Sequence, residues 1–68
     1  MTIRVTIKKV KNKYYIAKSS YNKTFKIIKN EHIRTLYKND DYEFYCIRTK
    51  GIFRDILIPI SEEEALSQ

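Results

Sequence analysis

The residues between Lys8 and Lys29 have the charge and the aromatic content needed to hold a polyanion. This stretch contains eight lysines, three tyrosines and one phenylalanine, and it has no acidic residue. A lysine ammonium is a compact point charge on a flexible stem, well suited to phosphate oxygens. Aromatic rings within a basic groove are the usual platforms on which bases or riboses stack. The stretch therefore predicts contact with a nucleic acid.

The chain as a whole distributes its charge unevenly. Its 68 residues carry 14 Lys and Arg against 8 Asp and Glu, which gives a formal net charge of +6. The first 30 residues hold nine basic side chains and no acidic one, whereas the remainder holds five basic and eight acidic, so +9 and −3 sum to +6. Such asymmetry is typical of proteins that contact nucleic acid or a membrane surface. Lysines outnumber arginines ten to four, which favours contact with backbone phosphates over the reading of base edges.

Candidate contact residues lie on two parts of the chain. Strand alternation would place Arg4 and Lys8 on the wet face of a first strand and Lys26 on that of a third, with further lysines in the turns. A second, smaller basic group surrounds Gly51 in the otherwise acidic half. The residues predicted to bind nucleic acid are Arg4, Lys8, Lys9, Lys11, Lys13, Tyr15, Lys18, Tyr21, Lys23, Lys26, Lys29, Arg48, Lys50 and Arg54.

The tyrosines of the basic stretch are Tyr14, Tyr15 and Tyr21. Tyr14 and Tyr15 cannot both face outward in a regular strand, because successive side chains point to opposite faces. Tyr15 and Tyr21 are the two that we expect to reach the ligand.

Catalysis is not indicated. The chain offers one histidine, His32, one cysteine, Cys46, and no glycine-rich phosphate loop, whereas an enzyme needs several convergent groups in a cavity. These two residues fall short of the three or four ligands of a metal site. We expect a non-enzymatic protein without cofactor, metal or small-molecule substrate, in which Cys46 is a small buried side chain and His32 is structural.

The compartment follows from the same counts. A single cysteine allows no intramolecular disulfide, and no early stretch combines a basic start with the roughly 7 to 15 apolar residues of a secretion signal. The longest apolar run, Ile56 to Ile60, is too short to cross a bilayer. These features predict a cytoplasmic protein.

Hydrophobic periodicity predicts the elements that would position these residues. Alternation indicates strands over Thr2 to Val10, Tyr14 to Lys18 and Thr24 to Lys29, joined by polar turns into a meander. Ile33, Leu36 and Tyr37 then fall at i, i+3 and i+4, which predicts a short helix from Asn30 to Asn39.

The last third of the sequence predicts a second hairpin, from Tyr42 to Thr49 and from Ile52 to Pro59. We expect a type I turn between these strands, closed by a bulge at Gly51 with positive φ. Ser61 and Glu64 match a capping box for a C-terminal helical turn. The fold class is therefore mainly β (α+β), in a single domain over residues 1–68: a small, strongly bent five-stranded sheet or a partly open barrel, SH3-like or OB-like, with one short helix after the third strand.

Two stretches carry a family resemblance. "YYIAKSSYNKTFKIIKNEHIRTLYKN" followed by "IRTKGIFRDILIPI" resembles the small basic archaeal proteins that accompany ribosomes, in the order basic hairpin, strand, short helix and closing strands. The resemblance implies contact with ribosomal RNA, beside neighbouring ribosomal proteins.

A second comparison and a third hypothesis stay open. The chain is similar to the small basic SH3-like chromatin proteins of archaea in size, lysine content and β-rich layout, but those proteins use a tryptophan and apolar wedges on DNA, and this sequence has no Trp. Ribosomal RNA is therefore the first expected partner and duplex DNA the second. The third hypothesis is a protein-interaction module or inhibitor that binds an acidic partner.

Overall fold

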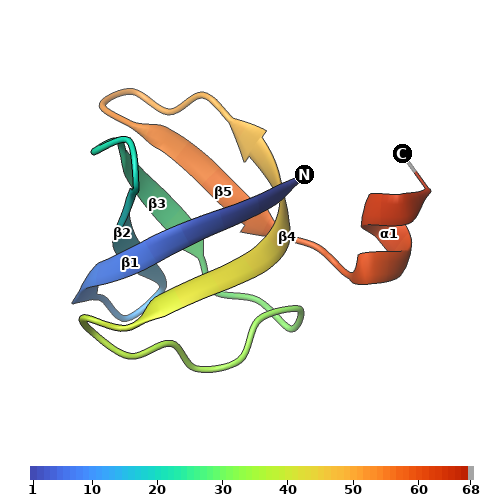
Figure 1. Ribbon diagram of the computed structural model, residues 1–68, viewed down its shortest axis with the longest axis horizontal. Coiled ribbons are helices and arrows are strands. Elements are labelled where there is room, and N and C mark those ends of the chain that lie inside the picture. Colours follow the sequence, from blue (N-terminus) through green and yellow to red (C-terminus); the bar gives the residue numbers. More distant parts are fainter. Residues whose placement is uncertain (68) are drawn as a thin grey trace.

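The computed structural model describes residues 1–67, and five strands account for most of them (Figure 1). The strands are β1 (Thr2–Val10), β2 (Tyr14–Ser19), β3 (Thr24–Ile28), β4 (Asp41–Thr49) and β5 (Asp55–Pro59). They form a closed barrel in the order β1-β2-β3-β5-β4, in which β4 pairs again with β1. β3 and β5 pair in parallel, and the other neighbouring strands pair antiparallel.

Closure of the barrel depends on the length of β1. Its first half, from Thr2 to Thr6, pairs with β4, and its second half, from Val5 to Val10, pairs with β2. One strand that serves two neighbours in this staggered way brings the two ends of a sheet together. The prediction of a mainly β barrel is confirmed, whereas the alternative of an open, bent sheet is wrong.

The barrel interior is filled by one face of each strand. Alternation along β1 buries Val5 and Ile7 and leaves Arg4 and Lys8 in solvent, as the sequence predicts. Cys46 is fully buried on β4, which confirms its expected role as a small core residue. The other strand residues of the core are Tyr15, Ala17, Phe25, Ile27 and Leu57.

A bulge in β1 changes which lysines face outward. Ile7 pairs with Ala17, but Lys9 pairs with Ile16, so Lys8 is an extra residue in the ladder. Without the bulge, Lys9 would point into the barrel, because side chains alternate along a strand. The bulge instead places Lys9 opposite Ile16 on the outer face.

The predicted helix between the third and fourth strands is wrong. Residues 29–40 form an irregular connection that crosses one end of the barrel. Leu36 is buried at 3% exposure, and its backbone N–H donates to the hydroxyl of Tyr15 at 3.1 Å instead of to a helical carbonyl. The Asn30 side chain accepts from the His32 N–H and donates to the Pro59 carbonyl. A two-turn helix is marginal on its own, so these tertiary bonds decide the conformation.

The connection between β4 and β5 also differs from expectation. β5 begins at Asp55, so Ile52 and Phe53 belong to a loop from Lys50 to Arg54. Gly51 does not adopt positive φ. Glycine is required there for space, because a Cβ at this position would lie 2.3 Å from the Arg54 carbonyl oxygen. The predicted glycine bulge is therefore wrong.

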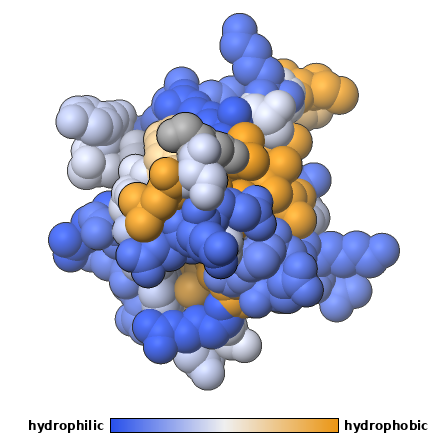
Figure 2. Space-filling view, turned by 90° about the vertical axis from the view of Figure 1, so that its right-hand side faces the viewer, coloured by the Kyte–Doolittle hydropathy of each residue, from blue (hydrophilic) through white to orange (hydrophobic). Residues whose placement is uncertain are grey.

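A short helix, α1 (Glu62–Leu66), follows β5 and confirms the predicted C-terminal helical turn. The Ser61 hydroxyl caps it by accepting from the Glu64 N–H at 3.1 Å. The helix has no buried residue and projects beside β4 (Figure 1). Figure 2, which views the α1 side of the barrel, shows apolar patches separated by hydrophilic side chains.

Candidate nucleic-acid interface

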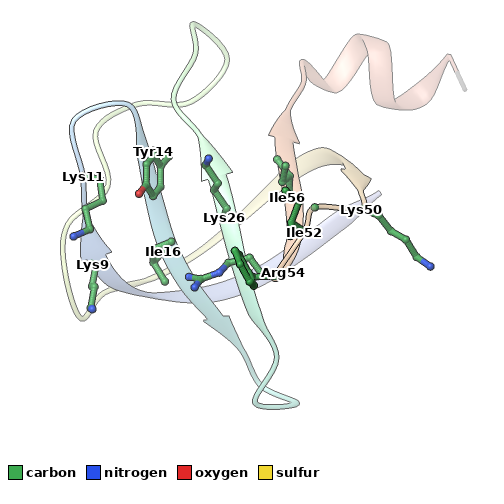
Figure 3. A pocket seen from close by; sticks show the side chains of 11 residues that line it. Lys9, Lys11, Tyr14, Ile16, Lys26, Lys50, Ile52, Arg54 and Ile56 are labelled. Carbon is green, nitrogen blue, oxygen red and sulfur yellow. The ribbon is translucent and has the colours of Figure 1, made fainter.

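A groove with a volume of about 860 Å³ lies on the outer face of β2 and β3 (Figure 3). Five of its lining residues are basic, and none of its lining residues within 1–67 is acidic. We call it the basic groove; it is lined by Lys9, Lys11, Tyr14, Ile16, Lys26, Ile56 and the loop residues 50–54.

The strand register builds the floor of the basic groove. Ile16 on β2 pairs with Lys26 on β3, and Lys26 pairs with Ile56 on β5. Lys9 on β1 continues this row because of the bulge. The floor therefore alternates apolar and basic side chains across four strands. A ligand lying across it would meet cations at intervals and apolar surface between them.

The walls of the basic groove come from two connections. Lys11 follows the end of β1 on one side, and the loop from Lys50 to Arg54 stands on the other. Figure 3 shows the Arg54 side chain directed across the groove toward β2, whereas the Lys50 side chain points away. Arg54 is thus the loop cation placed to meet a ligand inside the groove.

Tyr14 and Lys26 form a ridge at one side of the groove. The Lys26 ammonium lies 4.4 Å from the centroid of the Tyr14 ring, a cation–π contact worth about 0.5 to 1 kcal/mol at exposed sites. Beyond the ridge lies a second hollow of about 650 Å³, which adds Lys13 and Lys29 to the lining. The basic surface therefore continues from the groove to the turn between β1 and β2.

The position of Tyr15 corrects the prediction that this residue reaches the ligand. It is 3% exposed, it pairs with Ile27, and its hydroxyl accepts from the Leu36 N–H. The register places Tyr15 among the core residues and Tyr14 on the outer face. Tyr15 is therefore a buried core residue, and the tyrosine that lines the groove is Tyr14, which was missing from the predicted set.

Arg48 also has a structural role. Its guanidinium binds the Asp55 carboxylate at 2.6 and 2.7 Å, and its central carbon lies 5.0 Å from the centroid of the Phe25 ring. The hydrogen bond from Arg48 is the main reason why the pKa of Asp55 lies below its ordinary value, and Lys23, 3.8 Å away, acts in the same direction. Arg48 thus covers one end of the core and does not line the groove.

The remaining predicted contacts lie around the groove. Arg4 stands opposite Glu43 of β4, and Lys8 is the bulged residue of β1. Lys18 is half-buried on β2, and Tyr21 is 92% exposed in the turn between β2 and β3. The structure therefore brings together only part of the predicted set: Lys9, Lys11, Lys26 and Arg54 in the groove, Lys50 at its rim with the side chain pointing away, Lys13 and Lys29 beside it, and Lys23 in a further hollow past the loop.

His32 and Cys46 form no common site. Burial raises the pKa of the Cys46 thiol. The Nε2 atom of His32 lies 3.5 Å from the Glu31 carboxylate and 3.8 Å from that of Glu64 on α1. Within residues 1–67, no three His, Cys, Asp or Glu side chains are grouped to hold a metal ion.

Comparisons with family models, curated proteins and solved structures give no match for this chain. No helix within the described residues is long and apolar enough to cross a membrane. The fold and the site define a small, mainly β barrel that carries a basic groove on its outer face.

Proposed function

We propose that this protein is a small RNA-binding protein that holds RNA in the basic groove, chiefly through backbone phosphates. The observation that supports this most is the lining of the groove, which combines five basic residues with apolar Ile16 and Ile56 and aromatic Tyr14, without an acidic residue among the described lining. The cations suit backbone phosphates, and the apolar floor of Ile16 and Ile56, with the Tyr14 ridge beside it, suits unpaired bases.

The connectivity of the barrel supports an OB-like assignment over an SH3-like one. The barrel has a parallel β3–β5 pair and a β3–β4 connection that crosses its end. OB-fold barrels bind oligonucleotides and oligosaccharides on the face of their second and third strands and on the loops between strands 1 and 2 and strands 4 and 5. The same parts form the basic groove here. Its charge favours the polyanion over a neutral sugar.

Ribosomal RNA is the expected target because of the resemblance to small archaeal ribosome-associated proteins. Duplex DNA is the alternative nucleic acid. It presents phosphates on its outside and keeps its bases stacked, so the apolar floor at Ile16 and Ile56 would stay unfilled. A cytoplasmic, non-enzymatic protein that contacts RNA and neighbouring ribosomal proteins is the corresponding cellular assignment.

A pair of charge-matched variants tests this function. The groove variant carries Lys11→Glu and Arg54→Glu, and the control variant carries Lys38→Glu and Arg34→Glu in the β3–β4 connection. Each changes one Lys and one Arg, so each lowers the net charge from +6 to +2. All four residues are exposed, so both variants should fold with stability changes within about 0.5 kcal/mol.

The readout is the salt dependence of binding to single-stranded RNA, followed by fluorescence anisotropy. Neutralisation of about five phosphates predicts a slope of log K against log salt near −3.5, and the loss of two contacts should reduce its magnitude by about 1.4 in the groove variant only. Equal losses in both variants would mean that net charge alone matters. No loss in either would favour an acidic protein partner.

A further inference from the structure

The loop between β4 and β5 exposes two large apolar side chains next to each other. Ile52 and Phe53 are each 93% exposed, although both belong to residue types that normally enter a core. Lys50 and Arg54 flank them in the chain. Single exposed apolar residues are ordinary. Here two adjacent ones form an apolar loop tip at the rim of the basic groove, with a basic residue on each side in the chain.

The backbone of this loop turns back on itself at the tip. Gly51 lies so close to Arg54 that a Cβ would come within 2.3 Å of its carbonyl oxygen and 3.2 Å of the Ile56 side chain. The loop therefore folds back tightly on itself, and Ile52 and Phe53 occupy the outside of the turn. A tight turn presents its tip with less loss of conformational freedom on binding than a loose loop would.

The same loop separates two hollows. Residues 50–54 line the basic groove on one side, and on the other they line a hollow of about 660 Å³ with Asn22, Lys23 and Thr24. An RNA strand that runs along the outer face past β3 must meet the loop as a wall. At that point the RNA strand leaves the apolar floor and contacts the side chains of Ile52 and Phe53 instead.

We propose that Ile52 and Phe53 form an apolar wedge that stacks on the end of an RNA duplex, while the unpaired strand leaving that duplex lies in the basic groove. The inference rests on the proposed RNA-binding function and narrows its substrate to junctions between paired and unpaired RNA. Phe and Ile are among the apolar side chains that minor-groove DNA-binding proteins insert between base steps, and the same chemistry suits the exposed end of an RNA duplex. Lys50 and Arg54 stand beside the wedge, where the phosphates of the parting strands would pass.

Three RNAs test this inference: a blunt hairpin, a single strand of equal length, and the hairpin with a short overhang. The wild-type protein should bind the overhang hairpin about tenfold more tightly than either other RNA, which corresponds to stacking on one base. The wedge variant, Ile52→Ser with Phe53→Ser, should bind the overhang hairpin no more tightly than the single strand, because the groove still holds the unpaired strand, and should keep the salt dependence. The control variant, Tyr37→Ser with Leu66→Ser, removes one aromatic and one aliphatic side chain that are 64% and 74% exposed elsewhere, and should behave as wild type.

A second readout reports the stacking itself. With 2-aminopurine at the first unpaired position, fluorescence should rise on binding of wild type, since an apolar side chain replaces a neighbouring base, and should stay unchanged with the wedge variant. Equal wild-type affinity for the overhang hairpin and the single strand, or a preference for the overhang hairpin over the single strand that survives in the wedge variant, would overturn the wedge while leaving RNA binding intact. Absence of RNA binding altogether would remove the proposed function and the wedge with it. Binding to phosphatidylserine vesicles that is lost in the wedge variant, with unchanged RNA preference, would assign the tip to a membrane surface instead.

Discussion

Two adjacent tyrosines show how one residue of register separates core from surface. Tyr14 lies on the outer face beneath the Lys26 ammonium, and Tyr15 lies inside the barrel with its hydroxyl bound to the Leu36 N–H. The two rings are chemically identical, so the sequence cannot indicate which of them lies inside the barrel. Pairing of Tyr15 with Ile27 and of Ala17 with Phe25 settles the choice, because these four residues share the interior face.

Removal of each tyrosine hydroxyl should therefore have a different effect. Tyr15→Phe leaves the buried Leu36 N–H without its acceptor, and we expect a loss of about 1 to 3 kcal/mol in the free energy of unfolding. Tyr14→Phe removes no intramolecular hydrogen bond described for that residue, and we expect a change within about 0.5 kcal/mol. Urea unfolding measures both. The opposite order of sensitivity would place β2 one residue out of the described register.

Among the elements, the loop between β4 and β5 contributes most to the site and was hardest to predict. Its packing at Gly51 leaves no room for a side chain, because the nearest atom is a backbone oxygen that cannot rotate away. The loop conformation and the position of the proposed wedge thus depend on one small residue. Its glycine is required by contact distance and not by an unusual dihedral angle.

Gly51→Ala should lower the free energy of unfolding by about 1 to 3 kcal/mol, the usual cost of forcing an extra group into a packed space. It should also weaken the preference for overhang RNA, since the loop must shift. Asn12→Ala, an exposed turn position on the opposite side of the groove, is the matched control and should change neither property. Thermal unfolding and anisotropy report the two effects separately. Unaltered stability in Gly51→Ala would show that the loop relaxes without cost.

Prediction from sequence succeeded where alternation has one clearly wet face. β1 and β3 expose lysines on one side and bury branched or aromatic residues on the other, so their faces were predictable. The helix predicted for residues 30–39 was wrong because Ile33 and Leu36 have helical spacing but instead pack against the core at the end of the barrel. The assignment of Ile52 and Phe53 to the last strand was wrong because apolar residues next to a buried strand favour the strand. Their exposure depends on tertiary contacts. Lys9 joined the groove only through a bulge that leaves no signal in the sequence.

At the scale of the whole molecule, basic and acidic residues are segregated onto different elements. The nine basic residues of the first 30 positions belong to β1, β2, β3 and their turns, whereas the acidic residues lie mainly on β4 and α1 and in the connection before β4. A 68-residue chain buries only about 60% of the surface that it exposes when unfolded, so its stability is small. A ligand that neutralises one side of the barrel should therefore change the stability of the entire fold.

Single-stranded RNA at about one hundred times its dissociation constant should raise the free energy of unfolding by about 2.7 kcal/mol, which shifts the melting temperature by on the order of 10 °C. High salt should abolish this shift, because phosphate contacts weaken steeply with ionic strength. The groove variant should show a smaller shift than the charge-matched control. Differential scanning fluorimetry at two salt concentrations provides the measurement. A shift that is insensitive to salt would indicate that apolar contacts dominate binding.

The parallel pairing of β3 with β5 also has a consequence for folding kinetics. Phe25 pairs with Asp55 and Ile27 with Leu57, so each contact closes a loop of about 30 residues. Non-local pairings of this kind form late and place small barrels among the slower-folding domains. The basic groove takes its floor from β1, β2, β3 and β5 and one wall from the loop before β5. An unfinished barrel therefore has the lysines but not the groove, and the proposed recognition of RNA can begin only after β5 has docked.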